Sequence, residues 1–145
     1  MARSGRPPKI DPLKPIHRAV MDNDVSTFSV ELAAGSDINA PGPEGMTPLH
    51  IAADRGNVEF AKALLDAGVE VDPINVWGNT PLWVAIMKQS RTCPDGSMIR
   101  LLLDRGANPN RTEGKNSPLV MIHRIAGFPS ELIELIEEKA KQLRP

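Results

Sequence analysis

The three histidines and the single cysteine of this sequence, His17, His50, His123 and Cys93, are the first candidates for catalysis or metal binding. Imidazole is a common general base and metal ligand. His17 and His50 are 33 residues apart. If the chain consists of stacked units of that length, the two rings lie about 10 Å apart, too far to share a zinc ion with bonds near 2 Å. His123 stands alone in an apolar segment, which predicts a partly buried structural residue.

Cys93 lies in a polar segment, residues 89–96, with no histidine close in sequence. A nucleophilic thiol needs a neighbouring base or a lowered pKa, so we expect an unreactive thiol. The sequence contains no phosphate-binding Gly-Lys-Ser/Thr loop, no paired cysteine motif and no Gly-x-Ser-x-Gly turn. We therefore predict no enzymatic activity, no cofactor and no metal site.

The composition restricts the class of protein further. The chain has 145 residues, with 17 Lys and Arg against 18 Asp and Glu and a formal charge of −1. That balance gives no overall attraction to nucleic acids or anionic membranes. The longest apolar run, Leu82 to Met87, is six residues, far short of the roughly 20 that cross a bilayer. One cysteine and no secretory signal pattern favour a cytoplasmic protein without membrane segments.

The strongest pattern is a repeat with a period of 33 residues, which connects Pro15, Pro48 and Pro81. The same period relates His17 to His50, Gly35 to Gly68, and Ala19, Ala52 and Ala85 in series. A fourth copy begins at Pro118, 37 residues after Pro81. The spacing has five additional residues before Gly106 and one fewer between Gly106 and Pro118. We expect this insertion to lengthen the turn between two helices, either as a second contact surface or as a tolerated loop.

Each unit contains signals for two helices and a polar arm. Thr47 is a good N-cap and Pro48 suits the first helical position, and Thr80-Pro81 and Ser117-Pro118 repeat this pair. Lys14-Pro15 keeps the proline without an oxygen-bearing cap. The second helices have Asp24, Asn57 and Asp95 as expected N-caps and Gly35, Gly68 and Gly106 as expected left-handed stops. A Gly-containing segment such as residues 39–45 then predicts an extended arm with a tight turn.

At these residues the sequence resembles the ankyrin repeat family. The resemblance rests on Thr47-Pro48-Leu49-His50-Ile51-Ala52-Ala53, Leu64-Leu65-Asp66-Ala67-Gly68, and residues 101–110. It implies an all-α solenoid of about four helix-turn-helix units with hairpin arms, with degenerate capping repeats at both ends. We expect repeats at about 13–40, 41–73, 74–110 and 111–145. It also implies that His17 and His50 hydrogen-bond backbone in the arms, whereas Trp83, which replaces the histidine, should pack and lose that bond.

Ankyrin repeats usually bind other proteins through the concave face that the inner helices and arms form together, and this resemblance implies the same here. We expect a monomer that masks a partner protein, such as a cognate toxin or an enzyme. This would be the role of an inhibitor or a toxin-neutralising immunity protein. Trp77 is either an interface anchor or a residue that lies across neighbouring arms. The predicted partner contacts, taken from arm tips and outward inner-helix positions, are Met21, Asp22, Glu44, Met46, Asp54, Arg55, Val76, Trp77, Asn79, Met87, Lys88, Arg111, Glu113 and Lys115.

Residues 1–12 form the remaining segment, and their first nine residues carry three positive charges and no negative one. We predict a disordered basic tail. The Gly5-Arg6-Pro7 core slightly resembles an AT-hook, but Ser4 stands where the hook has arginine. The alternative function is therefore a regulatory adaptor that is weakly tethered to nucleic acid through this tail, although the net charge argues against nucleic acid as a partner.

Overall fold

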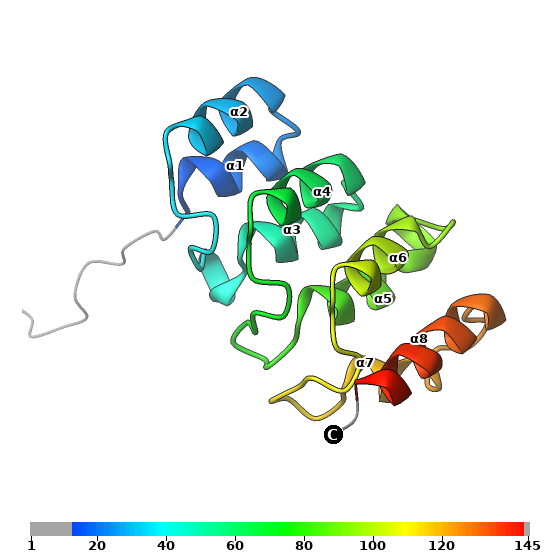
Figure 1. Cartoon of the computed structure of the whole chain (residues 1–145). Coiled ribbons are helices and arrows are strands. Elements are labelled where there is room, and N and C mark those ends of the chain that lie inside the picture. The colour runs from blue at the N-terminus through cyan, green and yellow to red at the C-terminus, as the bar shows by residue number, and fades with distance from the viewer. Residues whose placement is uncertain (1–12, 144–145) are drawn as a thin grey trace, which may run out of the picture.

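A computed structural model describes residues 13–143, and within that range all the regular secondary structure is helical, without strands. This confirms the all-α prediction. Figure 1 shows the helices packed side by side in chain order from one end of the molecule to the other. The basic tail that we predicted at residues 1–12 lies outside the described residues, so the proposed nucleic-acid tether stays a prediction. The helices are α1 (Pro15–Met21), α2 (Val25–Ala33), α3 (Pro48–Arg55), α4 (Val58–Asp66), α5 (Pro81–Thr92), α6 (Ser97–Asp104), α7 (Pro118–Ile122) and α8 (Ser130–Gln142), with a 3₁₀ turn, η1 (Pro43–Gly45).

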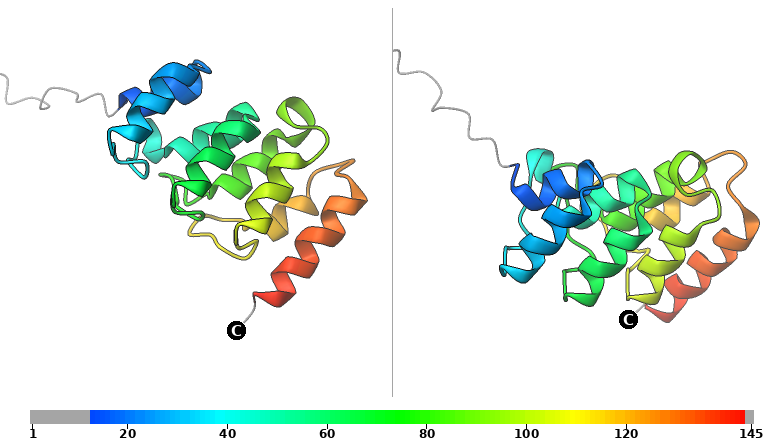
Figure 2. Two further views of the ribbon diagram at one scale, coloured as in Figure 1. Left: turned by 45° about the horizontal axis from the view of Figure 1, so that its top comes forward. Right: turned by 90° about the horizontal axis from the view of Figure 1, so that it is seen from above.

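The helices form four pairs, and successive pairs stack on one another. Helices α1, α3, α5 and α7 contact each other in series and form the inner row, while α4 packs on α6 and α6 on α8 in the outer row. The two views of Figure 2 show the same succession of pairs from other directions. The segments that follow α2, α4 and α6 project beyond the inner row (Figure 1), and we call them the arm loops. This stacking of helix pairs is the arrangement that the resemblance implied.

Every inner helix begins at a proline, as predicted. The hydroxyl oxygens of Thr47, Thr80 and Ser117 accept hydrogen bonds from backbone N–H groups at the third helical position, at 3.4, 3.3 and 3.3 Å. These bonds satisfy N–H groups that have no partner inside the helix. At α1 the cap residue Lys14 supplies no such oxygen; its own N–H donates to Nδ1 of His17 at 2.9 Å.

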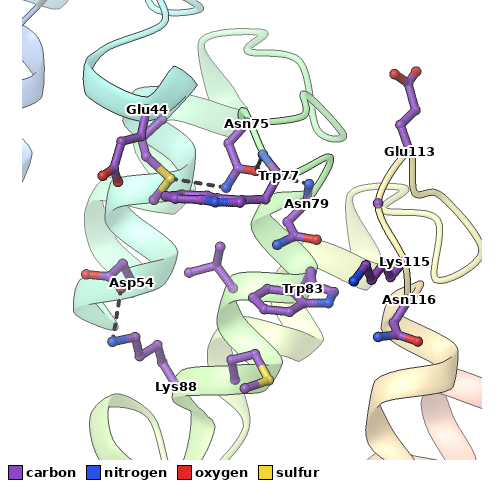
Figure 3. A pocket seen from close by; sticks show the side chains of 14 residues that line it. Glu44, Asp54, Asn75, Trp77, Asn79, Trp83, Lys88, Glu113, Lys115 and Asn116 are labelled. Atoms are coloured by element: carbon purple, nitrogen blue, oxygen red, sulfur yellow. Dashed lines mark hydrogen bonds and ion pairs between the residues drawn. The ribbon is translucent and has the colours of Figure 1, made fainter.

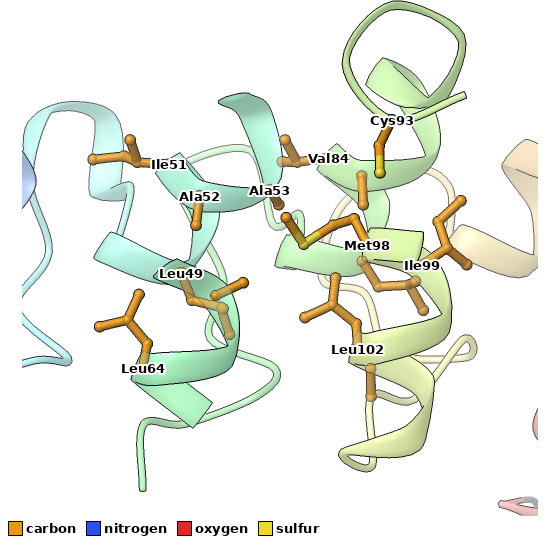
Figure 4. Packing of buried hydrophobic residues seen from close by; sticks show 14 of the residues in the cluster. Leu49, Ile51, Ala52, Ala53, Leu64, Val84, Cys93, Met98, Ile99 and Leu102 are labelled. Carbon is orange, nitrogen blue, oxygen red and sulfur yellow. The ribbon is translucent and has the colours of Figure 1, made fainter. Parts of the chain in front are cut away.

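The core consists mainly of aliphatic residues and alanine, which Figure 4 shows for the two central pairs. Leu49, Leu64, Leu82 and Leu102 are fully buried, and Ala52 and Ala61 lie between them with no exposed surface. Small side chains let adjacent helices approach closely while the leucines fill the spaces around them. Two of the few aromatic residues, Phe28 and Phe60, stack with ring centroids 4.4 Å apart.

Polar residues at equivalent positions connect each repeat to the next. The side-chain oxygen of Asn39 accepts the N–H of Glu70 at 2.8 Å, and the carboxylate of Asp72, 33 residues later, accepts the N–H of Asn108 at 3.0 Å. Between the third and fourth repeats, the side-chain N–H of Asn110 donates to the carbonyl of Ala140 at 3.1 Å. These bonds fix the spacing of the pairs beneath the outer helices.

Two details of the sequence interpretation need correction. The insertion before Gly106 lengthens the turn between α5 and α6 only from two residues to four, and its remaining residues extend α5 to Thr92, one helical turn beyond the position where α3 ends. The residue that caps α6 is Gly96 and not Asp95. Asp95 still contributes, since its carboxylate accepts the N–H of Ser97 at 2.9 Å.

Candidate functional site

A hollow with a volume of about 790 Å³ lies in the angle between the arm loops and the inner helices. We call it the larger hollow and the surface around it the concave face (Figure 3). Its walls come from three successive arm loops and from α3 and α5, so only the stacking of the repeats creates it. The lining residues are Glu44, Met46, Asp54, Asn75, Trp77, Asn79, Trp83, Val84, Met87, Lys88, Glu113, Gly114, Lys115 and Asn116.

The tip of the middle arm loop is held by Asn75, which is itself buried. Its side-chain oxygen accepts the N–H groups of Trp77 and Asn79 at 3.0 and 3.1 Å, and its own N–H donates to the carbonyl of Asn79 at 3.0 Å. Gly78 completes the turn with a φ of 77°, which a side chain would disfavour. This closed loop fixes the backbone from which Trp77 projects.

Trp77 is 55% exposed, and Figure 3 shows its indole lying over the larger hollow on the side of Glu44. The loops on either side are joined to this one through backbone: the N–H of Val76 donates to the carbonyl of Glu44 at 3.0 Å, and that of Glu113 to the carbonyl of Gly78 at 3.2 Å. The indole therefore has a rigid support and a large open surface, which is the arrangement that a binding anchor requires.

Trp83 lies on the opposite wall and differs from the equivalent histidines. The rings of His17 and His50 are fully buried, and their Nε2 atoms lie 2.7 and 2.8 Å from the backbone carbonyls of Ala40 and Asn79, as the resemblance implied. Trp83 is partly buried against the core, and its buried indole N–H has no hydrogen-bond partner within residues 13–143. The expected packing role and the loss of the imidazole bond are both observed.

Charged groups surround these apolar walls. Lys88 lies 3.4 Å from the carboxylate of Asp54, an ion pair between α5 and α3. Glu113 is 3.8 Å from Arg111. Glu44 is exposed and, among residues 13–143, has no cation within 4.0 Å. Lys115 lies across the hollow from Glu44 (Figure 3). The rim thus offers both signs of charge around an aromatic and methionine-lined interior.

A second hollow of about 210 Å³, the smaller hollow, adjoins the first. Glu44, Met46 and Asp54 line both, so they form the boundary between the two. The other residues of the smaller hollow are Leu13, Met21, Pro43, Ile51 and Arg55. Residues from all four expected repeats consequently line the two hollows together.

The structure brings most of the predicted partner contacts together. Those that line the larger hollow are Glu44, Met46, Asp54, Trp77, Asn79, Met87, Lys88, Glu113 and Lys115, and Met21 and Arg55 line the smaller one. Outside both lie Val76, which is 67% exposed at its arm tip, the exposed Asp22 at the end of α1, and Arg111. The role of all these residues, inside and outside the hollows, in binding a partner stays a prediction.

Five residues that line the larger hollow are not among the partner contacts predicted from the sequence: Asn75, Trp83, Val84, Gly114 and Asn116. Asn75 could have been found, because an Asn two residues before the arm tip is typical of a side chain that closes its own turn. For Trp83 the sequence predicts only a packing role. Its position in the wall of the larger hollow depends on where the third arm loop lies. Nothing in the sequence indicates that Gly114 faces the same space as Val84.

The candidates for catalysis do not converge. Burial lowers the pKa of His50 to about 4 and also lowers that of His17, so both are neutral structural rings near neutral pH. His123 is exposed rather than partly buried, because it ends α7, and its Nε2 lies 3.0 Å from Glu137. Cys93 is buried, with Sγ 2.9 Å from the hydroxyl of Ser97. Within residues 13–143 no three His, Cys, Asp or Glu side chains are grouped so that they could hold a metal ion.

No helix between residues 13 and 143 combines the length and the apolar character needed to cross a membrane.

Comparisons with known proteins point to one family. A family model described as "Ankyrin repeats (3 copies)" matches residues 16–113. Similar proteins include Rabankyrin-5 of Mus musculus, which is 36% identical in an alignment that covers 51% of this chain and 7% of that protein. Potassium channel GORK of Arabidopsis thaliana is 32% identical over 77% of this chain and 11% of its own length. Ankyrin repeat and KH domain-containing protein mask-1 of Caenorhabditis elegans is 30% identical over 90% of this chain and 5% of its own. The chain spans about a tenth or less of these relatives.

Proposed function

Because this chain belongs to the ankyrin repeat family, whose repeats are protein-interaction modules, we propose that it is a non-enzymatic module that binds a folded partner protein through its concave face. The observation that carries the proposal is the larger hollow, with the half-exposed indole of Trp77 over it. Trp77 and Met87, which line the larger hollow, are 55 and 41% exposed, and Val76 beside Trp77 in the chain is 67% exposed. Clustered apolar groups with a polar rim are typical of protein-binding sites.

We propose masking as the output of binding. A partner that places a side chain in the larger hollow covers its own surface around that side chain, and occupancy alone then blocks whatever this surface does. Neutralisation of a toxin is one case of masking, and it applies where the captured partner is toxic when expressed without this chain. We also propose that the protein is a cytoplasmic monomer when it is free.

The test is affinity purification from the native host with the wild-type chain and a Trp77→Ala/Met46→Ala variant. Both residues line the larger hollow, and loss of one buried indole at an interface costs about 2 kcal/mol or more, roughly a 30-fold loss of affinity. We expect the variant to lose a partner that the wild type retains.

The matched control is Val25→Ala/Val30→Ala, which removes two exposed apolar side chains from α2, outside both hollows. The control should retain the partner. Equal retention by both variants would exclude the concave face as the binding site. Growth of cells that express the captured partner, with and without this chain, then tests neutralisation.

A further inference from the structure

The two hollows form one path that starts where the described chain starts. Leu13 lines the smaller hollow, and Glu44, Met46 and Asp54 lead from there into the larger one. The chain that precedes Leu13 therefore leaves from the wall of the smaller hollow.

The rim along this path can accept a cation. The carboxylate of Glu44 has no ion-pair partner within residues 13–143, whereas Asp54 already has Lys88. Glu44 and Trp77 both line the larger hollow and lie on the same side of it (Figure 3), so a carboxylate and a half-exposed indole border one stretch of this path. An arginine on an indole face with a carboxylate beside it gains both cation–π and charge-assisted hydrogen-bond energy.

Residues 1–12 have the matching chemistry and length. They carry Arg3, Arg6 and Lys9 against one acid, Asp11, and their prolines favour an extended chain. At about 3.1 Å per residue, Lys9 can reach roughly 12 Å from Leu13 and Arg6 roughly 22 Å. Adjacent helices lie 8–10 Å apart, so these distances correspond to about one and two repeats along the inner row.

We propose that residues 1–12 bind the concave face of their own chain, with Lys9 paired to Glu44 and Arg6 on the indole of Trp77. Bound in this way, the segment covers the surface that we assign to the partner, and a partner must displace it. The inference uses the same face as the proposed function, but it concerns the chain by itself and is tested without any partner.

The test places a nitroxide label at position 4 of the full chain, by Ser4→Cys in a Cys93→Ser background, and follows the NMR signals of the labelled protein. We expect selective broadening of the Trp77 indole N–H and of the Glu44 and Val76 amides. The broadening should disappear in an Arg3→Ser/Arg6→Ser/Lys9→Ser variant. It should also weaken in 1 M salt, where the Debye length falls to about 3 Å.

The control removes three exposed cations that line neither hollow, by Lys62→Ser/Arg124→Ser/Lys141→Ser, and should leave the broadening intact. Broadening confined to residues next to Leu13, or unchanged by the triple substitution at residues 3, 6 and 9, would overturn the proposal. So would equal broadening of an isotope-labelled chain by a nitroxide on a second, unlabelled chain, because the segment would then bind another copy. Partner capture is read separately through Trp77→Ala/Met46→Ala, so either proposal can fail alone.

Discussion

The Nε2 of His50, on the inner helix α3, lies 2.8 Å from the backbone carbonyl oxygen of Asn79, in the arm loop of the next repeat. Its Nδ1 accepts the N–H of Thr47 at 3.1 Å, so the proton is on Nε2 and donates to Asn79. One buried neutral ring thus connects the start of a helix to the loop that carries Trp77.

We expect His50→Ala to lower the free energy of unfolding by about 3 kcal/mol, because it removes two hydrogen bonds and leaves a cavity and a carbonyl without its donor. Urea titration at pH 7 measures the loss. His123→Ala is the control and should change stability by less than about 0.5 kcal/mol, since His123 is exposed. Similar losses in both variants would contradict the role of His50.

The same ring should make stability depend on pH. The pKa of His50 is about 4 in the folded state, below the ordinary 6.5, so between these values the unfolded chain binds more protons. The contribution of His50 to the free energy of unfolding is fully present above pH 6.5. It falls by roughly 3 kcal/mol as the pH is lowered toward 4. Urea titrations across this range should show a slope that His50→Gln largely removes.

Asp72 should act in the opposite direction. Burial raises the pKa of its carboxyl to about 6, although the N–H of Asn108 and the charge of Arg111 oppose the shift. Ionisation of Asp72 lowers the free energy of unfolding. This loss therefore becomes smaller as the pH falls from 6 toward 4 and the carboxyl is protonated. We expect Asp72→Asn to stabilise the protein above pH 6 by about 1 kcal/mol and to have no effect below pH 4.

The equivalent positions Asn39 and Asn110 already have the amide, which supports the substitution. Thermal unfolding at pH 4 and pH 8 measures the difference between the variant and the wild type. A stabilisation of equal size at both pH values would show that the charge is not its cause.

Two glycines that end helical segments should respond differently to alanine. Gly56 and Gly68 both have positive φ, 68° and 90°. A Cβ at Gly56 would lie 2.5 Å from the carbonyl oxygen of Thr92, in the extra turn of α5, whereas at Gly68 it would meet nothing within 4 Å. We expect Gly68→Ala to cost about 1 kcal/mol for the backbone conformation alone, and Gly56→Ala distinctly more. Equal losses in urea titration would mean that the contact between α3 and α5 is not tight.

Trp77→Ala should separate binding from stability. The indole is 55% exposed, so its removal should change the free energy of unfolding by less than about 1 kcal/mol. Affinity for a captured partner should fall about 30-fold or more. Calorimetric titration and urea titration of the same variant measure the two quantities. A large loss of stability would show that the indole supports the arms rather than a partner.

Helix starts and most stops could be predicted because they depend on local chemistry. Proline at the first helical position and an oxygen-bearing cap before it act within one turn, and Gly56 ends α3 through its own backbone. The extra turn of α5 was missed, although the signal was present: Gln89 stands where the repeat places Gly56, so no left-handed stop exists there. Its buried side chain instead donates to the carbonyl of Pro94 at 2.7 Å.

The sequence by itself determined the unit and its repetition, since a periodic pattern of caps, prolines, small residues and stops specifies each helix pair and predicts that pairs stack. The tertiary structure alone decided which side chains share a space. Glu44, Trp77 and Lys115 belong to three different arm loops, and their convergence on one hollow depends on the angle at which successive pairs stack and on the backbone bonds between the loops. Local sequence preferences carry no information about that angle, because it results from packing across the whole interface between repeats.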